Sequence, residues 1–282
     1  MKVFLIGSTG YIGTALRSAC GLRWNTLGTS AAGKADIAFS LNRPEAFPYG
    51  LVNAGDFVVV MAAISSPDAC AKDYDNARQV NVTGTLALIR GVVDRGARVI
   101  FFSSDTVYGA REESVDEDVA LTPVGAYGEM KRDVEMAAAC DAVKVIRLSY
   151  VFSFGDRFSR YLFDCAQTGR KAEIFKPFSR CVVHLRDVVD GVVRLVEDWD
   201  AVSERVFNFV GPHLVPRETM VERIHALVLP ALDYVISEPS TTFFDNRPRV
   251  INASSARFAR LLGRGPSSLG DAIDLEMANM GA

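Results

Sequence analysis

The sequence predicts an α/β fold: a doubly wound parallel sheet with a small C-terminal lobe. Short apolar runs alternate with amphipathic stretches along the first half of the chain. The runs are continuous and lack alternate polar residues, which is typical of parallel strands buried on both faces. The chain has 282 residues, 49% of them hydrophobic, which is enough for one large domain with a smaller lobe.

The apolar runs predict the strands, and the stretches between them predict the helices. Pro67 suits the first turn of a helix. The last strand, VKVIRLSYVF, is rich in β-branched residues, which favour strands. We expect strands at 2–7, 24–29, 35–39, 56–63, 97–104 and 143–152, and helices at 11–20, 67–90 and 126–140.

The pattern loosens after residue 152, where Pro, Phe and Arg become more frequent. Residues 1–152 are therefore predicted to form the large domain, to which 181–211 returns. Residues 153–180 and 212–282 are predicted to form mainly the substrate-binding lobe. A terminal helix is expected to stop at Gly263.

Composition excludes several classes of function. The net charge is −3, and no basic stripe indicates a nucleic-acid or membrane partner. The five cysteines form no C-x-x-C pair and the three histidines lie far apart, so neither a disulfide framework nor a metal site is expected. The chain starts on a strand pattern with no signal peptide, and no apolar run reaches about 18 residues, so we expect a cytoplasmic protein.

The segment GSTGYIG, residues 7–13, follows the first strand and opens the first helix. Its glycines permit a tight turn and a close approach of backbone to a pyrophosphate, which the helix N-terminus then faces. This pattern predicts a dinucleotide-binding Rossmann fold, although a glycine-rich turn without a ligand remains possible. The predicted cofactor contacts in the turn are Gly7, Gly10, Tyr11, Ile12 and Gly13.

The end of the second strand indicates which dinucleotide binds. An NAD site has an acidic residue there, but this chain has Thr29 and Ser30, with Lys34 beyond. Hydroxyls and a lysine favour the 2′-phosphate of NADP, with NAD as a possible substitute, unless these are ordinary turn residues. Asp36 and Ile37 are predicted beside the adenine, or else in a solvated turn.

A tyrosine and a lysine four residues apart predict the catalytic centre. Tyr127 and Lys131 share a helix face, and an ammonium near a phenol lowers the pKa of the phenol. Ser104 ends its strand and could hydrogen-bond the same reacting oxygen. The alternative is a solvated helix face anchored by a tyrosine.

These segments together resemble the extended short-chain dehydrogenase/reductase family, especially its nucleotide-sugar enzymes. GSTGYIG, VVVMAA, NVTGT, SSDTVYG, YGEMK and RLSYVF follow the family's order and spacing over nearly the whole chain. The resemblance implies catalytic roles for Ser104, Tyr127 and Lys131 and a cofactor contact for Ala62 and Ala63. It also implies that Asn81 supports the site.

The residue after Ser104 bears on the reaction. Dehydratases of the family place Asp-Glu there, whereas this chain has Asp105 and Thr106. The missing glutamate argues against a dehydratase. Asp105 is left as a proton relay in contact with substrate or as a structural cap.

Three further segments bear on the substrate. RLSYV resembles R-T-S-W-V of the dTDP-4-dehydrorhamnose reductases, which would let Tyr150 stack on a sugar if it is not simply core. SRCVVHLRDVV is similar to a segment of epimerases in which Arg180 would contact the nucleotide or diphosphate. Arg247, or its neighbour Arg249, would clamp a diphosphate. The alternative is that these arginines are exposed surface residues.

The resemblance implies an NADP-dependent reductase of a nucleotide-linked keto-sugar, acting at carbon 4 of a 6-deoxy-4-keto sugar. A nucleotide-sugar epimerase with retained NAD is the nearest alternative, and a non-catalytic regulatory subunit is a second. The resemblance also implies a homodimer that pairs through helices 67–90 and 126–140.

Overall fold

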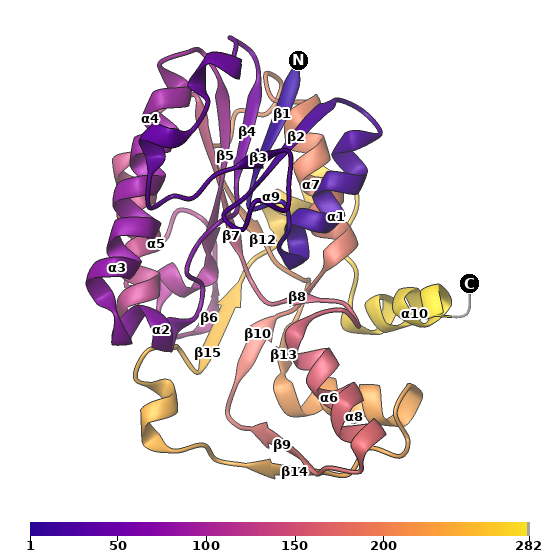
Figure 1. The fold of residues 1–282 in the computed structure, drawn as a ribbon. Helices are drawn as coiled ribbons and strands as arrows, with labels where there is room; N and C mark the ends of the chain where they lie inside the picture. Colours follow the sequence, from indigo (N-terminus) through magenta and orange to yellow (C-terminus); the bar gives the residue numbers. More distant parts are fainter. Residues whose placement is uncertain (281–282) are drawn as a thin grey trace.

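A seven-stranded parallel sheet with helices on both faces forms the large domain of the computed structural model, which describes residues 1–280 (Figure 1). The strand order is β12-β7-β5-β4-β1-β2-β3, so the chain starts in the middle of the sheet and winds outward in both directions. The predicted doubly wound α/β fold is confirmed. The strands of this sheet are β1 (Lys2–Ile6), β2 (Asn25–Ser30), β3 (Ile37–Ala38), β4 (Phe57–Val60), β5 (Arg98–Ser104), β7 (Val143–Leu148) and β12 (Val206–Phe209).

Helices cover the two faces and enclose two apolar cores (Figure 1). One face carries α1 (Tyr11–Gly21), α7 (Leu185–Glu197) and α9 (Ala256–Leu262). The other carries α2 (Pro67–Lys72), α3 (Tyr74–Arg78), α4 (Thr85–Val93) and α5 (Gly125–Ala137), with the short turns η1 (Pro44–Ala46) and η2 (Tyr49–Leu51) beside them. Val58, Val59 and Val60 in β4 are all buried, because that strand faces both cores.

The long helix predicted over 67–90 is wrong in detail, because it is broken twice. At Asp73 the backbone leaves the helical region, with φ −132° and ψ 69°. Residues Gln79–Gly84 (η3) then form a π-helical turn before α4 begins. Gly84, the last residue of this turn, packs directly against the chain at Leu41. A Cβ there would lie 1.9 Å from the carbonyl oxygen of Leu41, so only glycine fits. Such π turns often lie at functional sites.

The strand predicted over 143–152 is also interrupted. β7 ends at Leu148, and the chain leaves the sheet at Ser149 and Tyr150 before β8 (Val151–Phe152) pairs with β11 (Val183–His184). The break exposes Ser149 and Tyr150 to a cavity below the sheet.

The smaller lobe is built on a four-stranded sheet of order β13-β10-β15-β6, below the large domain in Figure 1. A third apolar core lies between the strands and the helices of this lobe. Its strands are β6 (Arg111–Val115), β10 (Ser179–Cys181), β13 (Leu214–Pro216) and β15 (Val250–Ala253), with the separate pair β9 (Ala172–Phe175) and β14 (Tyr234–Ser237). Its helices are α6 (Arg157–Thr168), α8 (Arg217–Leu227) and α10 (Leu269–Met280), with the turn η5 (Thr241–Phe244). The turn η4 (Asp105–Tyr108) lies between β5 and β6 and contacts both α5 and β15.

The predicted domain boundaries differ from the structure at two elements. β6 lies within 1–152 but pairs with β15 in the lobe's sheet. α9 lies within 212–282 but packs on the large domain, because the Phe258 ring stacks on Phe209 with centroids 4.1 Å apart. Gly191 on α7 leaves room for both rings, since a Cβ there would lie 2.6 Å from each.

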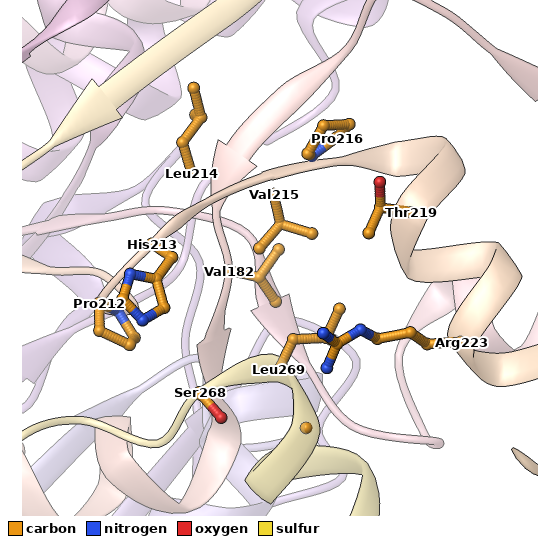
Figure 2. Close-up of a pocket in the computed structure, with 11 residues that line it drawn as sticks. Val182, Pro212, His213, Leu214, Val215, Pro216, Thr219, Arg223, Ser268 and Leu269 are labelled. Carbon is orange, nitrogen blue, oxygen red and sulfur yellow. The ribbon is translucent and has the colours of Figure 1, made fainter.

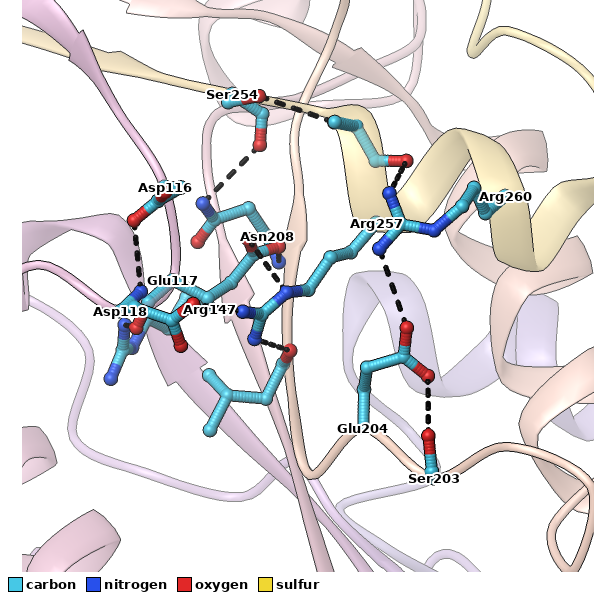
Figure 3. Close-up of polar contacts among 12 residues, drawn as sticks. Asp116, Glu117, Asp118, Arg147, Ser203, Glu204, Asn208, Ser254, Arg257 and Arg260 are labelled. Carbon is cyan, nitrogen blue, oxygen red and sulfur yellow. Dashed lines mark hydrogen bonds and ion pairs between the residues drawn. The ribbon is translucent and has the colours of Figure 1, made fainter.

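A buried polar network ties α5 to the strands at the carboxyl end of the sheet. Arg147 on β7 pairs with Glu135 on α5, with Nη2 2.8 Å from Oε2. Arg147 Nη1 also donates to the Tyr108 hydroxyl at 2.9 Å, which in turn donates to Asn208 on β12 at 2.6 Å. Figure 3 shows how the network continues through Glu117 to Arg257 at the start of α9.

Membrane insertion by a helix has no support in the described part of the chain. None of its helices combines the length and the apolar character needed to span a bilayer.

Replacing Phe258 tests how α9 is held to the large domain. The ring is fully buried against Phe209, so Phe258→Ala is expected to lower the free energy of unfolding by about 3–5 kcal/mol. Urea unfolding followed by circular dichroism measures this. Leu22→Ala is the control: Leu22 is 85% exposed, so its change should stay within about 0.5 kcal/mol. Equal effects of the two changes would contradict the packing described.

Candidate functional site

The glycine-rich turn between β1 and α1 has the close-packed geometry of a phosphate-binding turn. Gly7 has φ +91°, which side-chain-bearing residues rarely adopt. A Cβ on Gly13 would lie 2.3 Å from the Gly7 carbonyl oxygen, so only glycine fits. Gly10 is the N-cap of α1, and no side chain caps this helix end. The unpaired amides of the first turn are therefore open to an anionic ligand.

Thr29, at the end of β2, holds this turn in place. Its hydroxyl accepts from Gly7 N at 3.2 Å, and its carbonyl accepts from Ser8 Oγ at 3.1 Å. The neighbouring Ser30 hydroxyl accepts from Ala32 N at 3.2 Å. Both residues thus have structural roles, and their contact with a cofactor stays a prediction.

A cavity of about 240 Å³ lies beside the turn and brings predicted residues together. Its walls include Gly7, Thr29, Ser30, Ala62 and Ala63. The sequence did not single out the opposite wall, Ser40–Asn42, because the loop after β3 carries no motif. Of the other turn residues, Ile12 packs against a core and Tyr11 faces a different cavity.

Asp36 and Ile37, predicted beside the adenine, do not line this cavity. The Asp36 carboxylate accepts from Gly28 N at 2.7 Å and from Arg17 Nη2 at 2.8 Å, while Ile37 packs against a core. The backbone bond from Gly28 and the nearby Arg17 hold the pKa of Asp36 below its usual range. The end of β2 was expected to lack a carboxylate, and the structure supplies one from Asp36, the residue before β3.

A polar hollow of about 490 Å³ lies on the outer side of the same turn. Its walls include the hydroxyls of Ser8, Thr9 and Thr14 and the cations of Arg17 and Lys34. Lys34 was expected here from the sequence, whereas Arg17 was not. A basic residue one helical turn after Gly13 was the available signal, since positions four apart share a helix face.

Asn81 supports the loop that follows β4. Its side chain accepts from Ile64 N at 2.8 Å and donates to Ile64 O at 2.9 Å. Asn81 belongs to the π-helical turn and is 2% exposed. The pair of bonds fixes the backbone next to Ala62 and Ala63.

Ser104 lies at the carboxyl end of β5, and its hydroxyl is hydrogen-bonded to the two residues that follow it. It accepts from Thr106 N at 3.2 Å and from Thr106 Oγ1 at 3.0 Å. It also donates to Asp105 Oδ1 at 3.4 Å. Within residues 1–280 it makes no hydrogen bond to Tyr127, although α5 packs against this turn.

The predicted effect of Lys131 on Tyr127 is wrong in this structure. Burial raises the pKa of the Tyr127 phenol, and the nearby Cys70 and Asp105 raise it further. The Lys131 ammonium lies 5.7 Å from the centroid of the Tyr127 ring and donates instead to Phe102 O at 2.7 Å. Tyr127 is therefore held as a neutral phenol.

Lys131 is a buried cation, with 3% of its surface exposed. Burial lowers the pKa of its ammonium to about 8, although the Glu135 carboxylate one turn along α5 opposes the shift. The group therefore changes charge close to neutral pH, as groups in active sites often do.

A larger cavity of about 880 Å³ separates the large domain from the lobe. Tyr150 and Arg247, both predicted substrate contacts, lie in its wall. The Tyr150 hydroxyl donates to Asp156 Oδ1 at 2.5 Å, and burial raises its pKa. Arg247 reaches across from the lobe to Asp68 on α2, with Nη2 2.6 Å from Oδ2.

Asp105 and Arg180, the other two predicted substrate contacts, do not line this cavity. Asp105 Oδ2 accepts from Ser149 Oγ at 2.7 Å and lies 3.8 Å from Arg180 Nε. Burial raises the pKa of Asp105 against the opposing effect of Arg180. Arg180 is 6% exposed and is bonded to backbone carbonyls of the lobe.

Tyr11 connects the glycine-rich turn to the cavity between the large domain and the lobe. It belongs to the predicted cofactor turn but lines the larger cavity, and its hydroxyl lies 2.6 Å from Ser153 Oγ at the start of the lobe. Burial raises the pKa of this phenol. Within residues 1–280, no group of three His, Cys, Asp or Glu side chains is placed to hold a metal ion.

Known proteins of similar sequence include a dTDP-4-dehydrorhamnose reductase of Mycolicibacterium smegmatis. It is 27% identical over 159 residues, which is 55% of this chain and 47% of the relative. The beta subunit of mouse methionine adenosyltransferase 2 is 25% identical over 215 residues, 70% of this chain and 62% of the relative. The chain thus spans about half the length of the reductase it matches.

A solved structure of a dTDP-4-dehydrorhamnose reductase from Clostridium acetobutylicum has the same fold. It superposes with a TM-score of 0.83 at 18% identity, covering 100% of both chains.

The family described as RmlD substrate binding domain matches residues 1–227. That match covers well over half of the chain and agrees with the motifs at the turn, at Ser104 and on α5. The chain therefore belongs to the RmlD substrate binding domain family, within the extended short-chain dehydrogenase/reductases.

Proposed function

We propose that this protein is an NADP-dependent reductase of a nucleotide-linked keto-sugar. The observation that carries the proposal is the position of Tyr127 and Lys131. They lie on α5, which packs against β5, η4 and α2, and Pro67 and Asp68 of α2 line the 880 Å³ cavity. Cavities at the carboxyl ends of parallel strands are the usual ligand sites of this fold.

When bound, NADPH would supply a hydride to the ketone carbon of the sugar. Tyr127 would give its phenolic proton to the ketone oxygen, which becomes the hydroxyl of the product. The raised pKa of Tyr127 keeps that proton in place until the oxygen develops negative charge. Ser104 would turn its hydroxyl from Asp105 toward the same oxygen, and Lys131 would hold the cofactor's ribose.

The polar hollow supports the choice of NADP. Arg17 and Lys34 could receive a 2′-phosphate there, with hydroxyls from Ser8 and Thr9. Asp36 weighs the other way, but Arg17 neutralises it at 2.8 Å. NAD stays the alternative cofactor.

The substrate proposal rests on the Mycolicibacterium relative, whose name implies reduction at carbon 4 of a dTDP-linked 6-deoxy sugar. The 880 Å³ cavity is large enough for such a ligand and has arginines in its wall for the diphosphate. Asp105, bonded to Ser149 in that wall, stays either a proton relay or a structural cap.

Two other functions stay open to test. A nucleotide-sugar epimerase would use the same side chains while keeping its cofactor. A regulatory subunit is favoured by one observation, the similarity to the beta subunit of mouse methionine adenosyltransferase 2.

In this proposal the protein acts in the cytoplasm as a homodimer, and its two copies pair through α2–α4 and α5. Tyr74 on α3 and Met136 on α5 are large apolar side chains exposed on those helices, 41% and 69% respectively.

Oxidation of NADPH and of NADH by the purified protein, with dTDP- and GDP-linked 4-keto-6-deoxy sugars, tests the function. Turnover should require NADPH, and Tyr127→Phe should lower it by about 10²- to 10⁴-fold because the proton donor is lost. Tyr234→Phe is the control, since Tyr234 lies on β14 and lines neither cavity of the site. Sugar conversion without cofactor consumption would favour the epimerase, and retained partner binding without conversion would favour the regulatory subunit.

The pH dependence of turnover tests Lys131. Its pKa of about 8 means that the ammonium is charged below that pH and neutral above it. The kcat/KM should therefore fall as pH rises through about 8, because the positive charge that would hold the ribose disappears. Lys131→Met should lower the rate and abolish this fall. A level profile from pH 7 to 9.5 in the unaltered protein would contradict the role given to Lys131.

A further inference from the structure

Arg217, the first residue of α8, presents a cation without a bonded acceptor to the large cavity. Its side chain lines the cavity wall. Within residues 1–280, its guanidinium makes no hydrogen bond and no ion pair, although its backbone N–H donates to Phe178 O at 2.9 Å. Guanidinium groups that are largely removed from water ordinarily have a carboxylate or phosphate partner.

Two aromatic rings hold the Arg217 guanidinium in position. Its central carbon lies 4.6 Å from the centroid of Phe158 and 4.1 Å from that of Phe178. Such rings attract a cation by their faces and leave its N–H groups unbonded. The side chain is therefore oriented without being neutralised.

The nearby carboxylates are already engaged. Asp156 accepts from the Tyr150 hydroxyl, from the backbone of α6 and from Ser159 Oγ, so both its oxygens are bonded. Asp105 lies beside Arg180, and Asp68 is paired with Arg247. None of the three forms an ion pair with Arg217.

The charges around Arg217 favour an anion. Burial and the positive charges of Arg180 and Arg247 together lower the pKa of the guanidinium to about 10, although Tyr150 and Asp156 oppose the shift, so the group is still charged at neutral pH. Repulsion among these cations is relieved when an anion enters the cavity.

Arg180, to which the family resemblance gave the diphosphate, is not available in the same way. Its Nη2 donates to Pro248 O at 2.7 Å, and its Nη1 donates to Ser179 O at 2.7 Å and to Arg249 O at 3.2 Å. Its Nε lies toward Asp105, at 3.8 Å from Oδ2. Arg180 therefore joins β10 to the chain before β15, and three of its five N–H donors are bonded to backbone carbonyls.

We infer that Arg217, rather than Arg180, binds a phosphate of the substrate's diphosphate, together with Arg247. The inference rests on the proposed function, because it assumes that a nucleotide sugar occupies the cavity. Arg247 lines the same wall and would exchange Asp68, which is 62% exposed, for the second phosphate. The planar guanidinium of Arg217 suits two parallel bonds to phosphate oxygens.

Calorimetric titration with dTDP, UDP and thymidine tests the inference. Arg217→Gln should weaken binding of the preferred diphosphate by about 10- to 100-fold and leave thymidine binding unchanged, because charge-assisted bonds to the phosphate are lost. Arg223→Gln is the matched control, since Arg223 lies on the same helix but lines a separate pocket of about 360 Å³ with His213 (Figure 2). This control should stay within about twofold of the unaltered protein.

Loss of NADPH binding would reveal that Arg217→Gln fails to fold. Two further variants keep the test decisive in that case. Arg217→Met keeps an apolar stem between the two rings and should also lose diphosphate affinity. Arg217→Lys should weaken dTDP or UDP binding more than Arg180→Lys does. The reverse order, or unchanged affinity in Arg217→Met, would overturn the inference while leaving the proposed function intact. Failure of the unaltered protein to bind either diphosphate would overturn both.

Discussion

The site depends on one buried ion pair, between Arg147 at the end of β7 and Glu135 on α5. Both side chains are almost fully buried, at 6% and 2% exposure, so removing one partner would leave an uncompensated charge and cost about 3–5 kcal/mol. Glu135 also accepts from Ser103, next to Ser104, and lies one helical turn from Lys131. The pair thus fixes the helix that carries Tyr127 and Lys131 against the strand that ends in Ser104, and its negative member also supports the charge of Lys131.

The molecule concentrates positive charge at two places although its net charge is −3. One is the hollow beside the glycine-rich turn, with Arg17 and Lys34. The other is the cavity wall with Arg217 and Arg247. The first region is open and partly neutralised by Asp36, whereas the second is half-buried and held by aromatic rings. Two separate anionic ligands would explain this arrangement.

The fold and the cofactor side could be predicted from the sequence, because they follow from local patterns. Continuous apolar runs predict the strands. The spacing of the glycines predicts the tight turn in which Gly13 has no room for a side chain. Other features depend on contacts between distant residues. The Asp36 carboxylate reaches Gly28 from the bend before β3, and the burial that raises the pKa of Tyr127 has no sequence signature. Arg217 lies in a segment without a motif, and its importance comes from Phe158, 59 positions away in the sequence.

The most direct test of a Tyr127-centred reduction is to follow the hydride itself. The protein is incubated with NADPH carrying deuterium at the transferable position of the nicotinamide and with a dTDP-4-keto-6-deoxy sugar, and the product is examined by mass spectrometry and NMR. The proposed reduction predicts a product alcohol that carries the deuterium on carbon 4, with one NADP⁺ formed per sugar. Converted sugar without label from the added cofactor would contradict it.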